Sequence, residues 1–128
     1  MYSEYSQDSF EALIAKSADL SNKPFIHSVV KVNGEYNFEI VEFDLTLNVL
    51  CRDVDGRRLD RYDLELELYR SNNELVLVLA KLNYPEEPIL WSGAKILWMD
   101  SKTGKKCNPP NYSFKLENFA SRIRAFIC

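Results

Sequence analysis

The sequence has a single histidine and few glycines, and it lacks the motifs that mark the large enzyme families. Histidine occurs once, as His27, and glycine occurs only four times in 128 residues. Walker-type loops and the patterns G-x-S-x-G, H-E-x-x-H and G-x-G-x-x-G are absent. We therefore expect a non-enzymatic protein with no cofactor and no bound metal, in which His27 has a structural role.

Cysteine is also scarce. Cys51, Cys107 and Cys128 lie at long, unrelated spacings, with no C-x-x-C pair and no accompanying pair of histidines. This pattern predicts free thiols, so a reducing agent should leave the melting temperature unchanged. The position of Cys128 does not fit a C-a-a-X prenylation signal.

Long hydrophobic runs and a strong charge of one sign are missing too. No run of about 18 apolar residues occurs, and the first residues lack the cationic and apolar segments of a secretory signal. We expect a soluble, cytoplasmic protein without a membrane partner. The net charge of −3 argues against a nucleic-acid partner.

The charge is unevenly distributed along the chain. Residues 1–70 carry fourteen acids and eight bases, whereas residues 71–128 carry five acids and eight bases. The acidic part could attract the basic part of another copy, or of a partner. Two solvated surfaces of different sign are the plainer interpretation.

What the chain does contain is enough apolar material for one core. Hydrophobic residues make up 46% of the sequence, which predicts a single domain over residues 1–128. Leucines alternate with acids over residues 62–70. Residues 75–82 form a second run that is almost entirely apolar. The first pattern predicts a strand with one buried face and the second a central strand, joined as a hairpin. Counting outward from residues 72–73 places Leu68 opposite Leu77 and Leu66 opposite Leu79.

Two glycine-containing dipeptides predict further hairpins. Asn33-Gly34 would join strands at residues 25–32 and 35–41, with Val29 opposite Phe38 and His27 opposite Ile40. The alternation of apolar residues changes parity after that, which predicts a bulge at Val41-Glu42. Asp55-Gly56 would join the next strands and place Phe43, Leu45, Leu47 and Val49 opposite Leu68, Leu66, Leu64 and Tyr62. Residues 89–99 are predicted to form a last strand, with a bulge or a close approach at Gly93.

Helical periodicity occurs near both ends of the chain. Residues 9–20 carry one apolar stripe, and Asp8 with Glu11 resembles a capping box. Residues 113–127 carry a longer stripe of Leu116, Phe119, Ala120, Ile123, Phe126 and Ile127. The predicted fold class is α+β: an antiparallel β-meander of about five strands, with N- and C-terminal helices packed on the leucine face.

The same counting defines a second sheet face. On it, Asp44 would oppose Glu67, Thr46 would oppose Glu65, and Asn48 would oppose Asp63. In the next strand, Val76, Val78 and Ala80 would oppose Tyr69, Glu67 and Glu65. An aromatic and β-branched patch beside acids is typical of a protein contact surface. Alternatively, the N-terminal segment or the loop of residues 85–88 covers the patch, and the acids only solvate the sheet or hold a hard cation.

These patterns lead to a preferred function and two alternatives. The preferred hypothesis is a non-enzymatic binding or regulatory module that self-associates through the second face, using Glu65, Glu67, Tyr69, Val76 and Val78 against basic groups such as Arg122 or Arg124. The first alternative is a carrier of a small apolar ligand, with a pocket between the sheet and the C-terminal helix lined by Phe119, Ile123, Trp91 and Trp98. The two tryptophans fit core or edge positions equally well. The second alternative, an acid–base enzyme using Asp44, Glu65 and Glu67, has no supporting motif.

Overall fold

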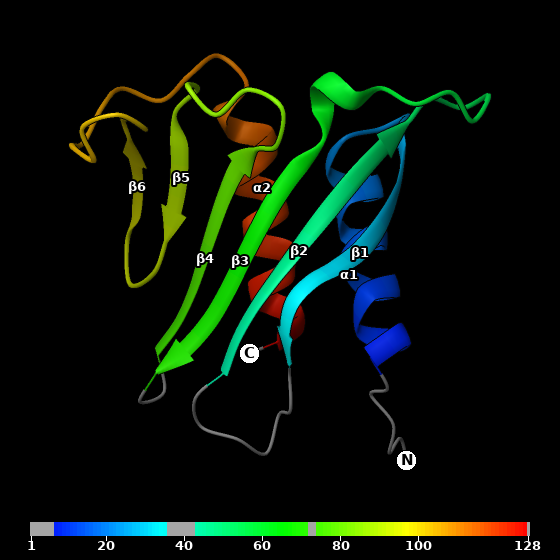
Figure 1. Cartoon of the computed structure of the whole chain (residues 1–128), viewed down its shortest axis with the longest axis horizontal. Helices are drawn as coiled ribbons and strands as arrows, with labels where there is room; N and C mark the ends of the chain where they lie inside the picture. Colours follow the sequence, from blue (N-terminus) through cyan, green and yellow to red (C-terminus); the bar gives the residue numbers. More distant parts are fainter. Residues whose placement is uncertain (1–6, 36–42, 72–73, 128) are drawn as a thin grey trace.

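The computed structural model describes residues 7–35, 43–71 and 74–127. The elements follow the chain in the order α1 (Gln7–Ser21), β1 (Ile26–Glu35), β2 (Phe43–Arg52), a short 3-10 helix η1 (Asp60–Tyr62), β3 (Leu64–Ser71), β4 (Glu74–Lys81), β5 (Ile89–Ser92), β6 (Ile96–Met99) and α2 (Ser113–Ile127). All six strands form one antiparallel sheet in sequence order (Figure 1). The predicted α+β meander is confirmed, with six strands in place of about five.

Both helices lie on the same side of the sheet, behind it in the view of Figure 1. The core between the sheet and the helices consists mainly of leucines from alternate strand positions and of the apolar stripes of α1 and α2. Its fully buried members include Ile14, Leu45, Leu47, Leu66, Leu68, Leu79, Leu90 and Ile123. Apolar residues recur every two positions in the strands and every 3.6 positions in the helices, and both patterns therefore place them at one interface.

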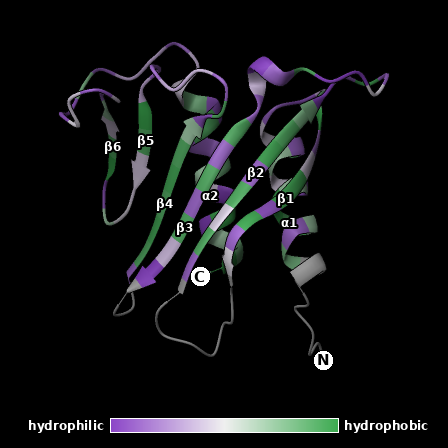
Figure 2. Cartoon of the chain, viewed as in Figure 1, coloured by the Kyte–Doolittle hydropathy of each residue, from purple (hydrophilic) through white to green (hydrophobic). Residues whose placement is uncertain are grey.

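The β3–β4 hairpin has the register that the sequence predicts. Leu66 pairs with Leu79 and Leu68 pairs with Leu77, and all four side chains are at most 1% exposed. Figure 2 shows the two patterns that define this hairpin, with alternating hydropathy along β3 and a mostly hydrophobic β4. Sequence counting succeeds here because only residues 72–73 separate the two strands.

The predicted β2–β3 register is wrong by two residues. Leu45 pairs with Leu68, and Leu47 pairs with Leu66, so the leucines keep their face but shift along it. The reason is the connection, which is longer than a two-residue turn: Arg52 forms an isolated bridge with Arg58, and η1 follows before β3 begins. A shift of two residues preserves side-chain alternation, so face alone cannot reveal it.

The predicted hairpin at Asn33-Gly34 is also wrong. Both residues lie inside β1, which pairs directly with β2, and a bulge between Lys31 and Asn33 changes the parity of the strand. Gly34 has φ +90°, and an added Cβ there would lie 2.0 Å from the carbonyl oxygen of Asp44. Glycine therefore serves a close approach between strands rather than a turn. The expected partners Phe38 and Ile40 and the bulge at Val41-Glu42 lie outside the described residues; His27 and Val29 pair instead with Cys51 and Val49.

Two smaller predictions also need correction. The predicted strand over residues 89–99 is a hairpin of β5 and β6, in which Leu90 pairs with Trp98. At Gly93 the close approach comes from the ring of Trp91, which would lie 2.5 Å from an added Cβ. α1 begins at Gln7, so Asp8 lies within the helix and cannot be its N-cap. No helix among the described residues is long and apolar enough to cross a membrane.

Candidate functional site

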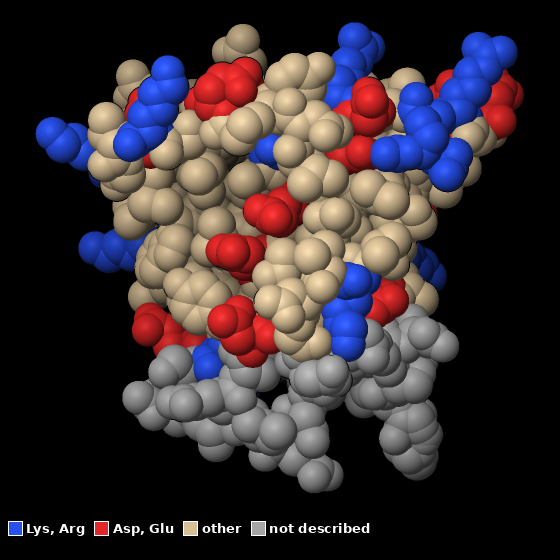
Figure 3. Space-filling view, viewed as in Figure 1, with Lys and Arg blue, Asp and Glu red and all other residues tan. Residues whose placement is uncertain are grey.

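The face of the sheet opposite the helices is turned toward the viewer in Figures 1 and 3, and we call it the open face. Figure 3 shows acids near the middle of this view, with lysines and arginines mainly around its periphery. One row of side chains runs across it through Thr46, Glu67, Val78 and Trp91, because these residues are paired strand by strand. The open face therefore combines the acids and the apolar residues that the sequence assigns to it.

The apolar part of the open face differs in detail from the prediction. Tyr69 and Val78 are half-buried, as is Trp91, whereas Val76 is only 5% exposed and offers little contact surface. β1 adds Val30, which is 49% exposed and pairs with Asn48. Sequence counting missed Val30 because it paired β1 with the wrong strand.

The three acids of the open face are close enough to influence one another. Thr46, rather than Asp44, lies opposite Glu67, and Asn48 lies opposite Glu65, so the acids are staggered and not directly paired. Burial, followed by the charges of Glu65 and Asp44, raises the pKa of Glu67 above its ordinary value. Staggering reduces the repulsion that directly opposite carboxylates would suffer.

The hydrogen-bond donors that the described residues place beside these acids are neutral groups, such as the side chains of Thr46 and Asn48. No ion pair to Asp44, Glu65 or Glu67 is formed there by a described residue. The Oδ1 atom of Asn48, beside Glu65 in the neighbouring strand, is buried without a hydrogen-bond partner. The open face is therefore an acceptor-rich surface that a partner with N–H donors would complement.

Three residues assigned to binding by sequence belong to the covered face. Trp98 is 3% exposed, and its Nε1 donates to Glu117 of α2 at 2.8 Å. Ile123 is fully buried in the core. Arg124 points to the strands beneath α2, where its Nη2 donates to the carbonyl of Ser92 at 2.7 Å and to that of Leu75 at 3.2 Å. Trp98 and Ile123 are thus core residues, and Arg124 is already engaged within the chain.

A pocket of about 570 Å³ lies on the helix side of the sheet, at the end where α1 stops and α2 starts. Phe119 lines it, as the carrier hypothesis requires, but Ile123, Trp91 and Trp98 do not. Its other aromatic lining comes from loops and element ends that carry no periodic signal: Phe25, Tyr62, Tyr112 and Phe114. A pattern-based search finds faces of helices and strands, so it could not assemble this set.

His27 sits at the edge of this pocket and is held by α1. Asp19 Oδ1 accepts hydrogen bonds from the backbone N–H of His27 at 2.7 Å and contacts its Nδ1 at 2.9 Å. The imidazole is almost fully buried and belongs to a contact that fastens the start of β1 to α1. Its geometry fits the structural role that the sequence predicts.

The ion pair between the exposed Arg58 and the buried Asp63 is a feature that sequence reasoning missed. Asp63 is 2% exposed; its Oδ2 accepts from Arg58 Nη2 at 2.6 Å and its Oδ1 accepts from the backbone N–H of Cys51 at 2.8 Å. Arg58 also donates to the carbonyl of Cys51. Asp63 was assigned to the open face, but this pair instead closes the connection between β2 and β3.

Metal chemistry receives no support from the described side chains, among which no group of three or more His, Cys, Asp or Glu could hold an ion. No curated protein and no solved structure matches the chain. A family model described as a domain of unknown function, DUF8659, matches residues 11–126, and the chain therefore belongs to this family.

Proposed function

We propose that the domain is a non-enzymatic binding module that self-associates through the open face. The observation that carries this proposal is that the two faces of the sheet are covered differently. Both helices pack on the leucine face, and no described element packs on the open face. A six-stranded sheet with half-exposed aromatic and aliphatic side chains beside unpaired acids has the composition of a contact surface.

The charge of the open face limits the way in which two copies can meet. A symmetric face-to-face dimer would bring two sets of the acids Asp44, Glu65 and Glu67 together, which is unfavourable in a partly desolvated contact. Contact with a basic surface of the second copy avoids this. With Arg124 engaged, the exposed candidates are Arg122 on α2 and the lysines of the loop after β6: Lys102, Lys105 and Lys106.

A variant of Val78 tests the proposal. Val78→Glu replaces the apolar side chain beside Glu67, in the middle of the open face, with a carboxylate, and we expect it to abolish association because the contact loses apolar surface and must desolvate a further charge. Val54→Glu is the matched control, since Val54 is 63% exposed in the β2–β3 connection, away from this face. Light scattering coupled to gel filtration measures the mass of each protein, and circular dichroism measures its melting temperature.

The expected pattern is an oligomer for the wild type and for Val54→Glu, and a folded monomer for Val78→Glu. Association should weaken as salt increases, because the contact joins opposite charges. A wild-type protein that remains monomeric at high concentration and low salt contradicts self-association. Unfolding of Val78→Glu would show that the chain itself covers the patch, and the proposal would fall.

A further inference from the structure

We propose that the pocket between the ends of the two helices binds a small aromatic acid: a flat apolar ring system carrying one carboxylate. This inference is independent of self-association, since the pocket lies on the helix side of the sheet. Its volume of about 570 Å³ is within the range of sites that hold small molecules.

The walls of the pocket supply the apolar half of this ligand. Phe25 and Tyr62 stack on each other with ring centroids 5.4 Å apart, and Phe119 closes the inner side from α2. Phe114, in the first turn of α2, lines the pocket although 61% of its surface is exposed. An aromatic ring left in this position can cover a flat ligand that enters beside it.

The charged groups of the pocket all have one sign. Lys23, Lys81 and Lys115 line it, and its lining contains no aspartate or glutamate, although acids outnumber bases in the whole chain. Lys81 Nζ lies 4.2 Å from the centre of the Tyr112 ring, and Lys115 Nζ lies 3.2 Å from Asn22 Oδ1. Two of the three ammonium groups thus have neutral partners, and an arriving carboxylate can bind them without breaking an ion pair to a described residue.

Acids just behind the lining do not cancel this charge directly. Asp19 is bound to His27, and Glu87 accepts the hydroxyl of Tyr112 at 2.8 Å. The carboxyl end of α1 and the amino end of α2 meet at the pocket with opposite dipoles, which offset each other. The lysines therefore decide the charge preference of the pocket.

Two ligands of nearly the same shape separate charge from apolar contact. Naphthalene-2-carboxylate and naphthalene-2-carboxamide are titrated into the full ¹⁵N-labelled chain, and amide chemical shifts give the location and affinity of each. We expect the carboxylate to shift the amides of Phe25 and Lys115, to leave those of Glu67 and Val78 unchanged, and to bind about fivefold or more tightly than the carboxamide.

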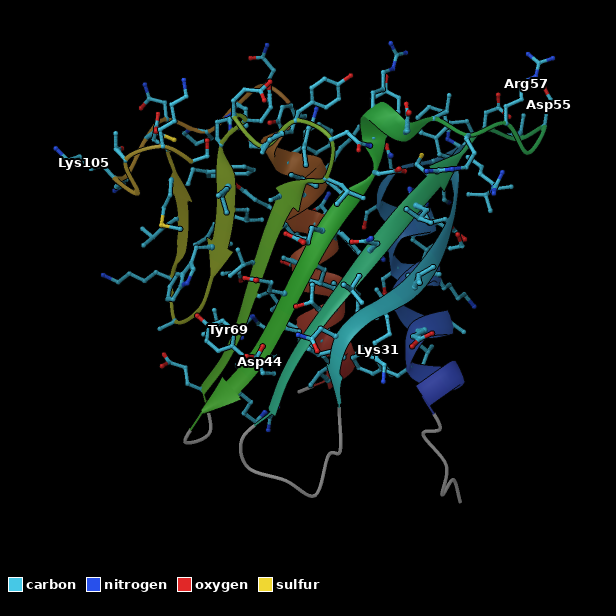
Figure 4. The ribbon with its side chains drawn as sticks, viewed as in Figure 1. Lys31, Asp44, Asp55, Arg57, Tyr69 and Lys105 are labelled. Atoms are coloured by element: carbon cyan, nitrogen blue, oxygen red, sulfur yellow. The ribbon has the colours of Figure 1, made fainter. Side chains whose placement is uncertain are left out.

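Variants assign the preference to the lysines. The double variant Lys81→Gln, Lys115→Gln should remove most of the difference in affinity between the carboxylate and the carboxamide, with only Lys23 left, and should leave the affinity for the carboxamide unchanged. Lys105→Gln is the control, because Lys105 is exposed in the loop after β6, where Figure 4 labels it, and does not line the pocket. Phe114→Ala should weaken the binding of both ligands by a similar factor, since it removes an apolar side chain that lines the pocket and does not change the charge of the pocket.

Three results overturn the proposal. The pocket does not hold such ligands if neither compound shifts its amides, or if the shifts gather on the open face. Equal affinities of the wild type for the two compounds would show that it does not select an anion. A double variant with the affinity of the wild type, and an unchanged melting temperature, would remove the lysines from the explanation.

Discussion

The two faces of the sheet come from the same strands but have opposite properties. Along β3, Leu64, Leu66 and Leu68 are buried beneath the helices, whereas Glu65 and Glu67 alternate with them on the other side. The covered face is almost entirely aliphatic and accounts for the core. The open face carries charge, polar side chains and only scattered apolar residues. Stability should therefore depend on one face and interaction on the other, and single substitutions can separate the two.

The largest effect is expected for a leucine of the covered face. Leu66→Ala should lower the free energy of unfolding by about 2 to 5 kcal/mol, because it leaves a cavity in a fully buried site. Glu65→Ala, one residue earlier and on the open face, should cost well under about 1 kcal/mol. Denaturant titrations of both variants measure the difference, and equal losses would mean that the faces are assigned wrongly.

A second comparison concerns two arginines of the β2–β3 connection. Arg58→Ala removes the cationic partner of buried Asp63 and should cost about 1 to 3 kcal/mol, because the carboxylate then keeps only the hydrogen bond from the Cys51 N–H. Arg57→Ala should have little effect, since the Arg57 side chain is exposed at the tip of the connection (Figure 4). Thermal melts of both proteins test this pair. If both variants lost the same amount of stability, the arginines would act through the net charge of the protein and not through the contact with Asp63.

The ionised side chain of Glu67 should slightly lower the stability of the folded protein at neutral pH. A carboxyl whose pKa is raised in the folded state binds its proton more tightly there, so ionisation lowers stability as pH rises through and above the ordinary value of 4.5. Glu67→Gln should therefore raise the melting temperature at pH 7 by about one degree, a small effect because the side chain is exposed. The gain should vanish below pH 4. Thermal melts across this pH range measure the gain, and Glu86→Gln is the control because Glu86 is exposed and lies outside the sheet. A gain in melting temperature that persists in acid would contradict the explanation.

The smallest expected effect leaves stability unchanged and concerns a thiol. Burial, with a further contribution from the charge of Asp63, raises the pKa of Cys51 to about 11. At pH 8 Cys51 should react with iodoacetamide far more slowly than the partly exposed Cys107, because the thiolate is the nucleophile. Mass spectrometry of digested, labelled protein measures both rates. Comparable labelling of the two cysteines in the folded protein would contradict the burial of Cys51.

Sequence reasoning was most successful where partners are close along the chain. It identified the β3–β4 register by counting from the turn at residues 72–73, and the apolar stripes of both helices from their periodicity. It was wrong where a dipeptide has more than one use: Asn33-Gly34 favours a tight turn and equally tolerates the positive φ inside a bulged strand. It was also wrong at Asp55-Gly56, because η1 lengthens the connection without changing the alternation of the leucines.

The candidate sites show the same limit. The acids of the open face follow from alternation within one strand, so they could be assigned before the fold was known. The pocket could not, because Lys23, Lys81 and Lys115 come from a loop, a strand and a helix that are brought together only by tertiary packing. Pairing Arg58 with Asp63 likewise depends on the path of an irregular connection.

The order of the strands has a consequence for how the protein is made. Each strand pairs with its neighbour in sequence, so the sheet can grow hairpin by hairpin as the chain leaves the ribosome. The helix α2 (Ser113–Ile127), which shares the cover of the leucines with α1, is however synthesised after all six strands. Until then only α1 can cover this face, and the aliphatic surface that α2 will bury stays exposed, which is the kind of surface that holding chaperones bind and that promotes aggregation.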